Sequence, residues 1–500
     1  MARITSKLRF GDAIWIIALS ALAIAANLGG AGRLSYHEAI VAQGAREMIA
    51  EGAYLVPTIG GTPWLEKPPL LHWLVVAADR LVPLIGPEGA ARLPSALAAI
   101  GLALGVGAFA AQRFGRRVGR IAGALQGTTL WTVIHGRLAE SDILLAALVV
   151  LTLLAFDRLR DGGPNFNRWR WAFFAGLGAT SLAKGVGFGA ALILATLAVF
   201  LVWQRRWDLA RRLVYPPGIV LALVIALAWP WAVWQWHPQA LDVWTLHVAD
   251  RLGGRSQHFA GEKGWEYALS FLWQTLPWTP LGVFSLFRAL RRPSRLNGTQ
   301  ALLLAWGVVP ALLVSLANTR NAHYLIYALP PWSIWGALGL TRLLARARRR
   351  GVPTRRIRRR ERLLVATAAA CLGLGIGLLG SRFDRRGVEW SFYAQAGRVA
   401  DENLPLLLLY DDWDRLPYPT PFGPVPHDLA VRLFYLNRPA TWIDRLPAPS
   451  SPSPPFFVIV RSRDLPALRS LGPVHLLLSG PSSRWDRTFG LYRVEVGDRR

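Results

Sequence analysis

The sequence has very little cysteine and little charge. Cys371 is the single cysteine among 500 residues, which excludes an intrachain disulfide and a cysteine-based zinc site. Charged residues make up only 17%, whereas a soluble domain carries about 25%. Hydrophobic residues account for 53%, and the mean hydropathy is +0.29. These values exclude a disordered chain, a collagen and a disulfide-rich mini-scaffold, and they predict a polytopic membrane protein.

Acidic residues are also scarce: the chain has 30 Asp and Glu but 57 Lys and Arg, which gives a net charge of +27. In a soluble protein that surplus would suggest nucleic acid, but a DNA-binding surface has no need of long apolar runs. A spanning helix needs roughly 20 apolar residues. Eleven such runs predict an all-α membrane domain: 12–28, 88–112, 118–135, 138–157, 171–183, 184–203, 214–236, 266–287, 299–317, 323–345 and 363–381. The first run, 12–28, is too long and unbroken for a cleaved signal peptide.

The cations are concentrated in every second connection between these runs. Cytoplasmic loops carry an excess of Lys and Arg, so this alternation predicts a cytoplasmic N-terminus and an opposite, outward face that is nearly neutral. The segment 342–362 alone holds eleven arginines. The run 169–203 is short for two spans and predicts a tight hairpin or a re-entrant pair. The run 68–86 predicts an amphipathic helix at the membrane interface.

Two domains are expected. Residues 1–381 form the transmembrane domain, with a long outward loop at about 29–87. Residues 382–500 alternate strand-like runs, such as 456–460, with helix-like runs, such as 428–435. That alternation predicts a small α/β domain on the outward side.

Ionisable residues gather on the predicted outward face, where apolar segments meet. Such groups are costly near a membrane and tend to face a cavity or the interior of a bundle. Four lysines occur among the 57 basic residues, and Lys67, Lys184 and Lys263 all fall on this face. The ammonium of lysine is a compact point charge, whereas the guanidinium of arginine is planar and delocalised. Lysine at these positions therefore suggests that a compact positive charge is needed there. The candidates are His37, Glu38, Glu66, Lys67, Arg137, Glu140, Asp142, Lys184, Arg251, His323 and Tyr324.

This set of side chains suits chemistry on a phosphate-bearing lipid. A carboxylate can accept the proton of a hydroxyl, and cations can hold a leaving phosphate. Simpler roles remain open for each residue. An outward Glu or Asp is often only solvated, Asp142 can be the N-cap of the helix that follows it, and His323 with Tyr324 can belong to an interfacial aromatic belt.

The arrangement resembles the GT-C class of membrane glycosyltransferases, in particular the bacterial protein-mannosyltransferase and aminoarabinose-transferase branch. The resemblance lies in Tyr36-His-Glu-Ala-Ile followed by Gly61-Thr-Pro-Trp-Leu-Glu-Lys-Pro-Pro69. It is supported by Glu140-Ser-Asp142, Ala183-Lys-Gly185, and His323-Tyr324 before Leu329-Pro-Pro331. The family usually has Asp-Glu where this chain has His37-Glu38, and the aminoarabinose branch often has Arg where it has Ile40. The full carboxylate pair and the aminoarabinose specificity therefore do not carry over.

The resemblance implies transfer of a sugar, with inversion, from a polyprenyl-phosphate carrier to a hydroxyl of a protein, lipid or glycan on the outer face of the plasma membrane. Catalytic roles would fall to Glu38, Asp142 and His37. The donor phosphate would be held by Lys67, Arg251, Lys184, His323 and Tyr324, with Glu66, Arg137 and Glu140 in support. A divalent metal has carboxylates to bind, but no spacing demands one. A transporter or flippase of lipid-linked sugars and a scaffold without catalysis are the alternatives. The absence of a sequence repeat disfavours the transporter.

Overall fold

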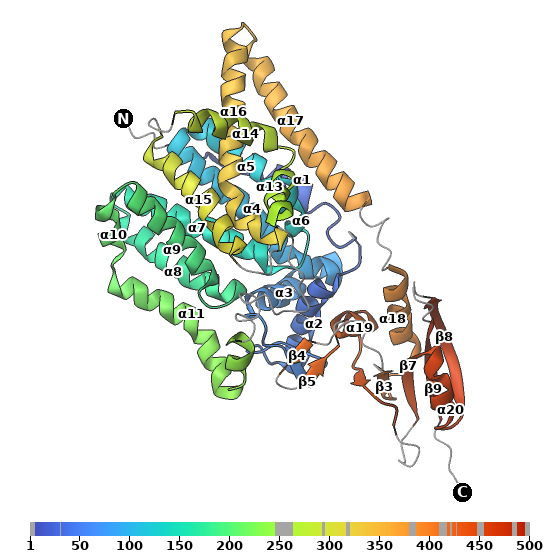
Figure 1. The fold of residues 1–500 in the computed structure, drawn as a ribbon. Helices are drawn as coiled ribbons and strands as arrows, with labels where there is room; N and C mark the ends of the chain where they lie inside the picture. Colours follow the sequence, from blue (N-terminus) through green and yellow to red (C-terminus); the bar gives the residue numbers. More distant parts are fainter. Residues whose placement is uncertain are drawn as a thin grey trace. The chain divides into compact units, whose positions relative to one another are not determined.

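The computed structural model shows a mostly helical protein in two compact units (Figure 1). One unit comprises Met1–Ala31 and Glu66–Leu379, and the other comprises Gly32–Leu65 and Gly380–Arg500. The second unit thus contains part of the predicted outward loop together with the C-terminal region. The structure describes residues 6–30, 32–245, 264–292, 296–316, 321–379, 387–409, 418–420, 423–426, 428–447, 455–482 and 488–495.

The first unit consists of helices of very different lengths. Its short or irregular elements are α3 (Leu70–Leu81), η1 (Pro83–Ile85), α6 (Leu130–Gly136), α10 (Trp207–Leu213), η3 (Ala322–Ala328) and η4 (Gly375–Leu379). Its longer helices are α1 (Phe10–Ile24), α4 (Gly86–Phe114), α5 (Arg116–Gly127), α7 (Ser141–Arg160), α8 (Phe166–Lys184), α9 (Phe188–Trp203), α11 (Pro216–Trp236), α13 (Gly264–Gln274), α14 (Thr279–Leu290), α15 (Gly298–Ser315), α16 (Pro330–Arg349) and α17 (Thr354–Leu374).

Helices overlap all eleven predicted apolar runs, but fewer are clear membrane spans. Within the described residues, three are long and apolar enough to cross a bilayer: Pro83–Phe114, Pro216–Trp236 and Gly298–Ser315. The pair α6 and α7, bent by 120° at its break, would make a fourth as one broken span. The run 266–287 is divided between α13 and α14. Eleven crossings therefore remain a prediction.

Helix α11 has the exposed apolar surface expected of a membrane-spanning helix. Large apolar side chains along it are exposed, among them Val220, Val224 and Trp231, at 57%, 58% and 63%. Monomeric soluble proteins rarely expose a contiguous apolar surface of this kind. A helix in contact with lipid can expose such side chains because lipid tails are as apolar as the side chains themselves.

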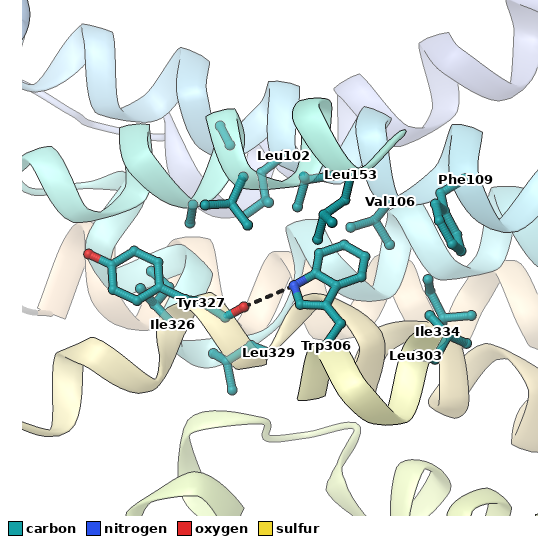
Figure 2. Close-up of a cluster of buried hydrophobic side chains, with 14 of the residues drawn as sticks. Leu102, Val106, Phe109, Leu153, Leu303, Trp306, Ile326, Tyr327, Leu329 and Ile334 are labelled. Carbon is teal, nitrogen blue, oxygen red and sulfur yellow. Dashed lines mark hydrogen bonds between the residues drawn. The ribbon is translucent and has the colours of Figure 1, made fainter. Parts of the chain in front are cut away.

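The hydrophobic core of the first unit is built where α4, α7, α15 and α16 meet η3 (Figure 2). Trp306 of α15 is fully buried, and its ring lies edge-on to Phe109 of α4, with the centroids 6.0 Å apart. Its Nε1 donates a hydrogen bond to the carbonyl oxygen of Tyr327, 3.1 Å away. A buried indole N–H needs such a partner. The core thereby fixes the position of η3, which carries candidate site residues.

Helices α8 and α9 form a hairpin that brings Lys184 to its tip. Gly185 follows Lys184 with φ of +112°, and Gly187 precedes α9 with φ of +81°. These backbone conformations favour glycine because it has no Cβ. The hairpin predicted for 169–203 is therefore present, and the turn follows directly after the lysine.

Buried ion pairs join the helices near their arginine-rich ends. Asp157 of α7 is fully buried; its Oδ2 lies 2.7 Å from Arg113 Nε, and its Oδ1 lies 2.9 Å from Arg160 Nη2. Glu361 of α17 binds two arginines of α5, Arg117 at 2.7 Å and Arg120 at 2.8 Å. Asp12 of α1 pairs with Arg116, also on α5. These pairs link α1, α5 and α17, and separately α4 and α7.

The second unit contains a five-stranded sheet in the order β6-β3-β7-β9-β8. β3 (Leu406–Leu409) runs parallel to β6 (Thr441–Ile443) and β7 (Phe456–Arg461), whereas β9 (Thr488–Val494) is antiparallel to β7 and to β8 (Val474–Ser482). Helix α19 (Leu429–Leu436) packs against α2 (Tyr36–Glu51) and α18 (Gly387–Val399). The remaining elements are the hairpins β1 (Thr58–Ile59) with β2 (Thr62–Pro63) and β4 (Tyr418–Thr420) with β5 (Gly423–Val425), and η6 (Ser462–Asp464) and α20 (Leu465–Arg469).

Candidate functional site

Asp142, Lys184 and Tyr327 come together from three separate elements of the first unit. The Lys184 ammonium forms an ion pair with Asp142 Oδ1. The Tyr327 hydroxyl donates to the same oxygen at 2.6 Å, and Lys184 Nζ lies 3.2 Å from that hydroxyl. The side chains of Lys184 and Asp142 are only 8% and 10% exposed. Both contacts use Oδ1, and Asp142 Oδ2 makes no hydrogen bond within the described residues.

Aromatic rings surround the Lys184 ammonium. Its Nζ lies 4.3 Å from the centre of the Tyr324 ring, 5.7 Å from that of Phe188 and 5.8 Å from that of Tyr327. A cation over aromatic faces is stabilised by about 0.5–2 kcal/mol, with the larger values where water is excluded. Tyr324 and Tyr327 share one side of η3 because residues three apart eclipse in a 3₁₀-helix. The ammonium is thus held by a carboxylate and by rings.

A second pair of polar residues lies beside this cluster. His135 Nδ1 is 2.9 Å from Glu140 Oε2, at the break between α6 and α7. The His135 ring is 6.2 Å from that of His323, which in turn lies 4.3 Å from the Tyr324 ring. His323 and Tyr324 therefore belong to a continuous polar and aromatic cluster.

The alternative role of Asp142 as a helix N-cap is wrong. Glu140 occupies the N-cap position of α7 without a side-chain capping bond, and Asp142 lies within the first turn, bound to Lys184 and Tyr327. Arg137, from the same tip, donates to the carbonyl oxygens of Ile24 and Ala26 at 2.6 and 2.7 Å. It therefore caps the end of α1. Near the start of α3, Lys67 Nζ lies 3.7 Å from Glu66 Oε1.

Glu38 and His37 lie in the second unit, at the start of α2. Glu38 is 2% exposed, and its Oε2 accepts hydrogen bonds from the backbone N–H and the hydroxyl of Ser35. The Ser35 hydroxyl accepts in turn from the Glu38 N–H, which completes a capping box. The His37 ring lies 3.9 Å from that of Tyr36. The structure thus gives Glu38 a structural role that sequence reasoning missed. Arg251 and Lys263 lie outside the described residues.

Tyr327 is the site residue that sequence reasoning missed. Its position three residues after Tyr324 was visible, and residues at this spacing share a side of an α-helix or a 3₁₀-helix. Nothing in the sequence, however, indicated that this side faces Asp142 and Lys184. Of the predicted residues, Asp142, Lys184, Glu140, His323 and Tyr324 lie close together. In the described part of the chain, no group of three or more His, Cys, Asp or Glu side chains is placed to hold a metal ion.

His72 of α3 is an unusual buried histidine. It is 3% exposed, and neither of its ring nitrogens has a hydrogen-bond partner among the described residues. Burial, together with the positive charge of Lys67, lowers the pKa of His72 to about 3. The imidazole is therefore neutral in the folded protein, whereas in the unfolded chain it takes up a proton near pH 6.5.

We expect acid to destabilise the protein partly through His72. Between pH 6.5 and 3 the unfolded state binds one more proton at this residue, so stability falls as pH falls, by up to about 1.4 kcal/mol for each pH unit. The variant His72→Leu should lose this component and unfold at a higher temperature at pH 5, because unsatisfied buried polar groups are costly. Thermal unfolding of the purified protein at pH 7.5 and pH 5 measures both effects. Equal pH dependence in both proteins would contradict the role of His72.

The comparisons with known proteins agree with this fold. Residues 66–234 match the family model described as dolichyl-phosphate-mannose-protein mannosyltransferase. Among solved structures, ArnT from Cupriavidus metallidurans bound to undecaprenyl phosphate superimposes with a TM-score of 0.76 at 20% identity, covering 96% of this chain and 97% of that one. The archaeal oligosaccharyltransferase AglB from Archaeoglobus fulgidus superimposes with a TM-score of 0.53 at 14% identity over 86% of this chain and 64% of that one. The chain therefore has the fold of the GT-C membrane glycosyltransferases, as its sequence predicted.

Two curated relatives with the same name are similar to this chain in sequence. The undecaprenyl phosphate-alpha-4-amino-4-deoxy-L-arabinose arabinosyl transferase of Aeromonas salmonicida is 28% identical over 318 residues, which are 61% of this chain and 55% of the relative. The protein of the same name from Pseudomonas savastanoi pv. phaseolicola is 26% identical over 363 residues, 69% of this chain and 64% of the relative. The matches thus span 55% and 64% of the length of these two relatives, less than two thirds of either.

Proposed function

We propose that this protein is an inverting glycosyltransferase of the plasma membrane. It moves a sugar from a polyprenyl-phosphate carrier to a hydroxyl of a lipid, protein or glycan acceptor on the outer face. The observation that carries the proposal is the Asp142–Lys184–Tyr327 cluster, set at the break between α6 and α7 of a GT-C fold. The sugars and carriers in the names of the relatives support this class of donor.

The geometry suggests which residue of the cluster accepts the proton and which stabilises the leaving phosphate. Lys184 and Tyr327 hold Oδ1 of Asp142, which leaves Oδ2 to receive the proton of the acceptor hydroxyl. The acceptor oxygen attacks the anomeric carbon opposite the phosphate, the bond from that carbon to the phosphate oxygen breaks, and the polyprenyl phosphate leaves with the bonding electrons. The Lys184 ammonium, with Lys67, then offsets the negative charge that develops on the phosphate.

The proposal predicts release of undecaprenyl phosphate by the purified full chain. The donors are undecaprenyl-phosphate-linked aminoarabinose and mannose, supplied with protein, lipid and glycan acceptors. Release that requires both donor and acceptor is the expected result. No release from any donor, combined with movement of a labelled donor across vesicles, would instead favour the transporter alternative.

Two variants at the start of α2, measured by the same release of undecaprenyl phosphate, distinguish a catalytic role of Glu38 from its role in the capping box. Glu38→Gln removes the negative charge but keeps the capping box, since Gln serves equally at that position. Ser35→Ala breaks the box, at a cost of about 1 kcal/mol, but keeps the carboxylate. If Glu38 acts in catalysis, Glu38→Gln loses about 10²-fold or more in turnover while Ser35→Ala stays near the wild type. The reverse order would assign Glu38 a structural role only.

A further inference from the structure

A basic groove lies along the N-terminal half of α17, away from the cluster described above. It is a cavity of about 770 Å³ lined by four arginines of α17, Arg355, Arg358, Arg359 and Arg362, together with Trp15 of α1 and Leu363. The two helices pack against each other. Arginine-rich ends of membrane helices usually point into water, so their convergence on a cavity needs a separate explanation.

The groove follows from the spacing of the arginines on α17. Residues at i, i+3, i+4 and i+7 lie on one side of an α-helix, and the four arginines have this spacing. Ile357, Glu361 and Val365, spaced four apart on an adjacent side, are each 3% exposed. That side attaches α17 to the rest of the unit, and the arginine side is left along the open edge of the contact with α1.

In the part of the chain that the structure describes, no carboxylate neutralises the positive charge of this groove. The two carboxylates closest in sequence to its lining, Asp12 and Glu361, are already bound to arginines of α5. Within the described residues, none of the four groove arginines forms an ion pair. Like charges at i and i+4 destabilise a helix, so an external anion bound here would relieve that repulsion.

The groove also has an apolar end. Trp15 is half-buried, and Leu363 is 62% exposed. Beyond Leu363 the helix continues as an apolar segment to Leu374. A ligand that fits must therefore carry an anionic group at one end and a hydrocarbon chain at the other. A small anion would contact only the arginines.

We propose that this groove binds an anionic phospholipid of the surrounding bilayer. Its phosphodiester lies among Arg355, Arg358, Arg359 and Arg362, because guanidinium groups match phosphate oxygens with paired hydrogen bonds. Its acyl chains lie along Trp15 and Leu363. Basic pockets beside membrane helices recognise lipid headgroups in this way. The site is separate from the Asp142 cluster and does not depend on the proposed transferase activity.

The test compares two charge-matched double variants of the full chain purified in detergent. Arg358→Gln/Arg362→Gln removes two groove arginines. Arg356→Gln/Arg360→Gln removes two arginines of the same helix with the same spacing, which do not line the cavity. Binding of phosphatidylglycerol, phosphatidylcholine and inorganic phosphate is measured by titration, and each variant is first checked for monodisperse elution and wild-type thermal unfolding.

The wild type should bind phosphatidylglycerol in preference to phosphatidylcholine. The groove variant should weaken this binding about tenfold or more, and the control variant by no more than about twofold. Leu363→Gln should weaken phosphatidylglycerol binding but leave inorganic phosphate unaffected. Equal losses in both double variants would show diffuse attraction and overturn the proposal. So would inorganic phosphate binding as tightly as the lipid, or no preference between the two lipids.

Discussion

Replacing Asp142 with asparagine should reduce sugar transfer by about 10²- to 10⁴-fold, the range expected when a general base is lost. The carboxylate is held at one oxygen by Lys184 and Tyr327, and an amide of the same shape removes its charge without opening a cavity. The measurement is the initial rate of undecaprenyl phosphate release under saturating donor. A wild-type rate in Asp142→Asn would exclude Asp142 from the reaction.

Two further variants separate the charge of Asp142 from its packing. Tyr327→Phe removes only the hydroxyl and should cost about tenfold, since one hydrogen bond to a charged group is worth about 1.5 kcal/mol. The single variant Asp142→Asn leaves the nearly buried Lys184 ammonium without its carboxylate, which should lower thermal stability. The double variant Asp142→Asn/Lys184→Met should regain that stability but not the activity. Recovery of both would reduce the cluster to a structural ion pair.

The largest expected effect on stability comes from Asp157. This fully buried carboxylate contacts Arg113 of α4 and Arg160 of its own helix. Asp157→Asn leaves Arg160, whose side chain is 9% exposed, without an acidic partner among the described residues, whereas Arg113 keeps Asp161 at 2.9 Å. Removing one partner of a buried ion pair is strongly destabilising, so the free energy of unfolding should fall by about 3 kcal/mol. Denaturant unfolding of the purified protein, followed by tryptophan fluorescence, measures the change.

Asp208 provides the matched control for this experiment. It also pairs with an arginine, Arg206 at 2.8 Å, but both side chains are about half exposed. Exposed ion pairs contribute little because water screens them, so Asp208→Asn should unfold almost like the wild type. Similar destabilisation by both variants would show that burial is not what makes the Asp157 contact important.

Much of the membrane domain could be predicted from the sequence because its signals are local. Helices overlap all eleven apolar runs, although the run 266–287 is divided between α13 and α14. The alternating arginines, with eleven in 342–362, are a property of the chain alone. The same holds for Lys184, whose flanking glycine marks a turn, and for the motifs that resemble the GT-C transferases. Asp142 and Lys184 could thus be named in advance, whereas Tyr327 could not.

What each of these residues contacts was decided only by the tertiary structure. Asp142 and Lys184 are 42 positions apart, and Tyr327 lies 185 positions from Asp142. Their meeting depends on the break between α6 and α7, on the α8–α9 hairpin and on the hydrogen bond from Trp306 that holds η3. The arginines of the groove on α17 likewise have no acidic partner among the described residues, because arginines of α5 bind Asp12 and Glu361. The sequence by itself determined the class of fold and the inventory of charges. Packing decided which charges are paired, which are buried and which remain available to a ligand.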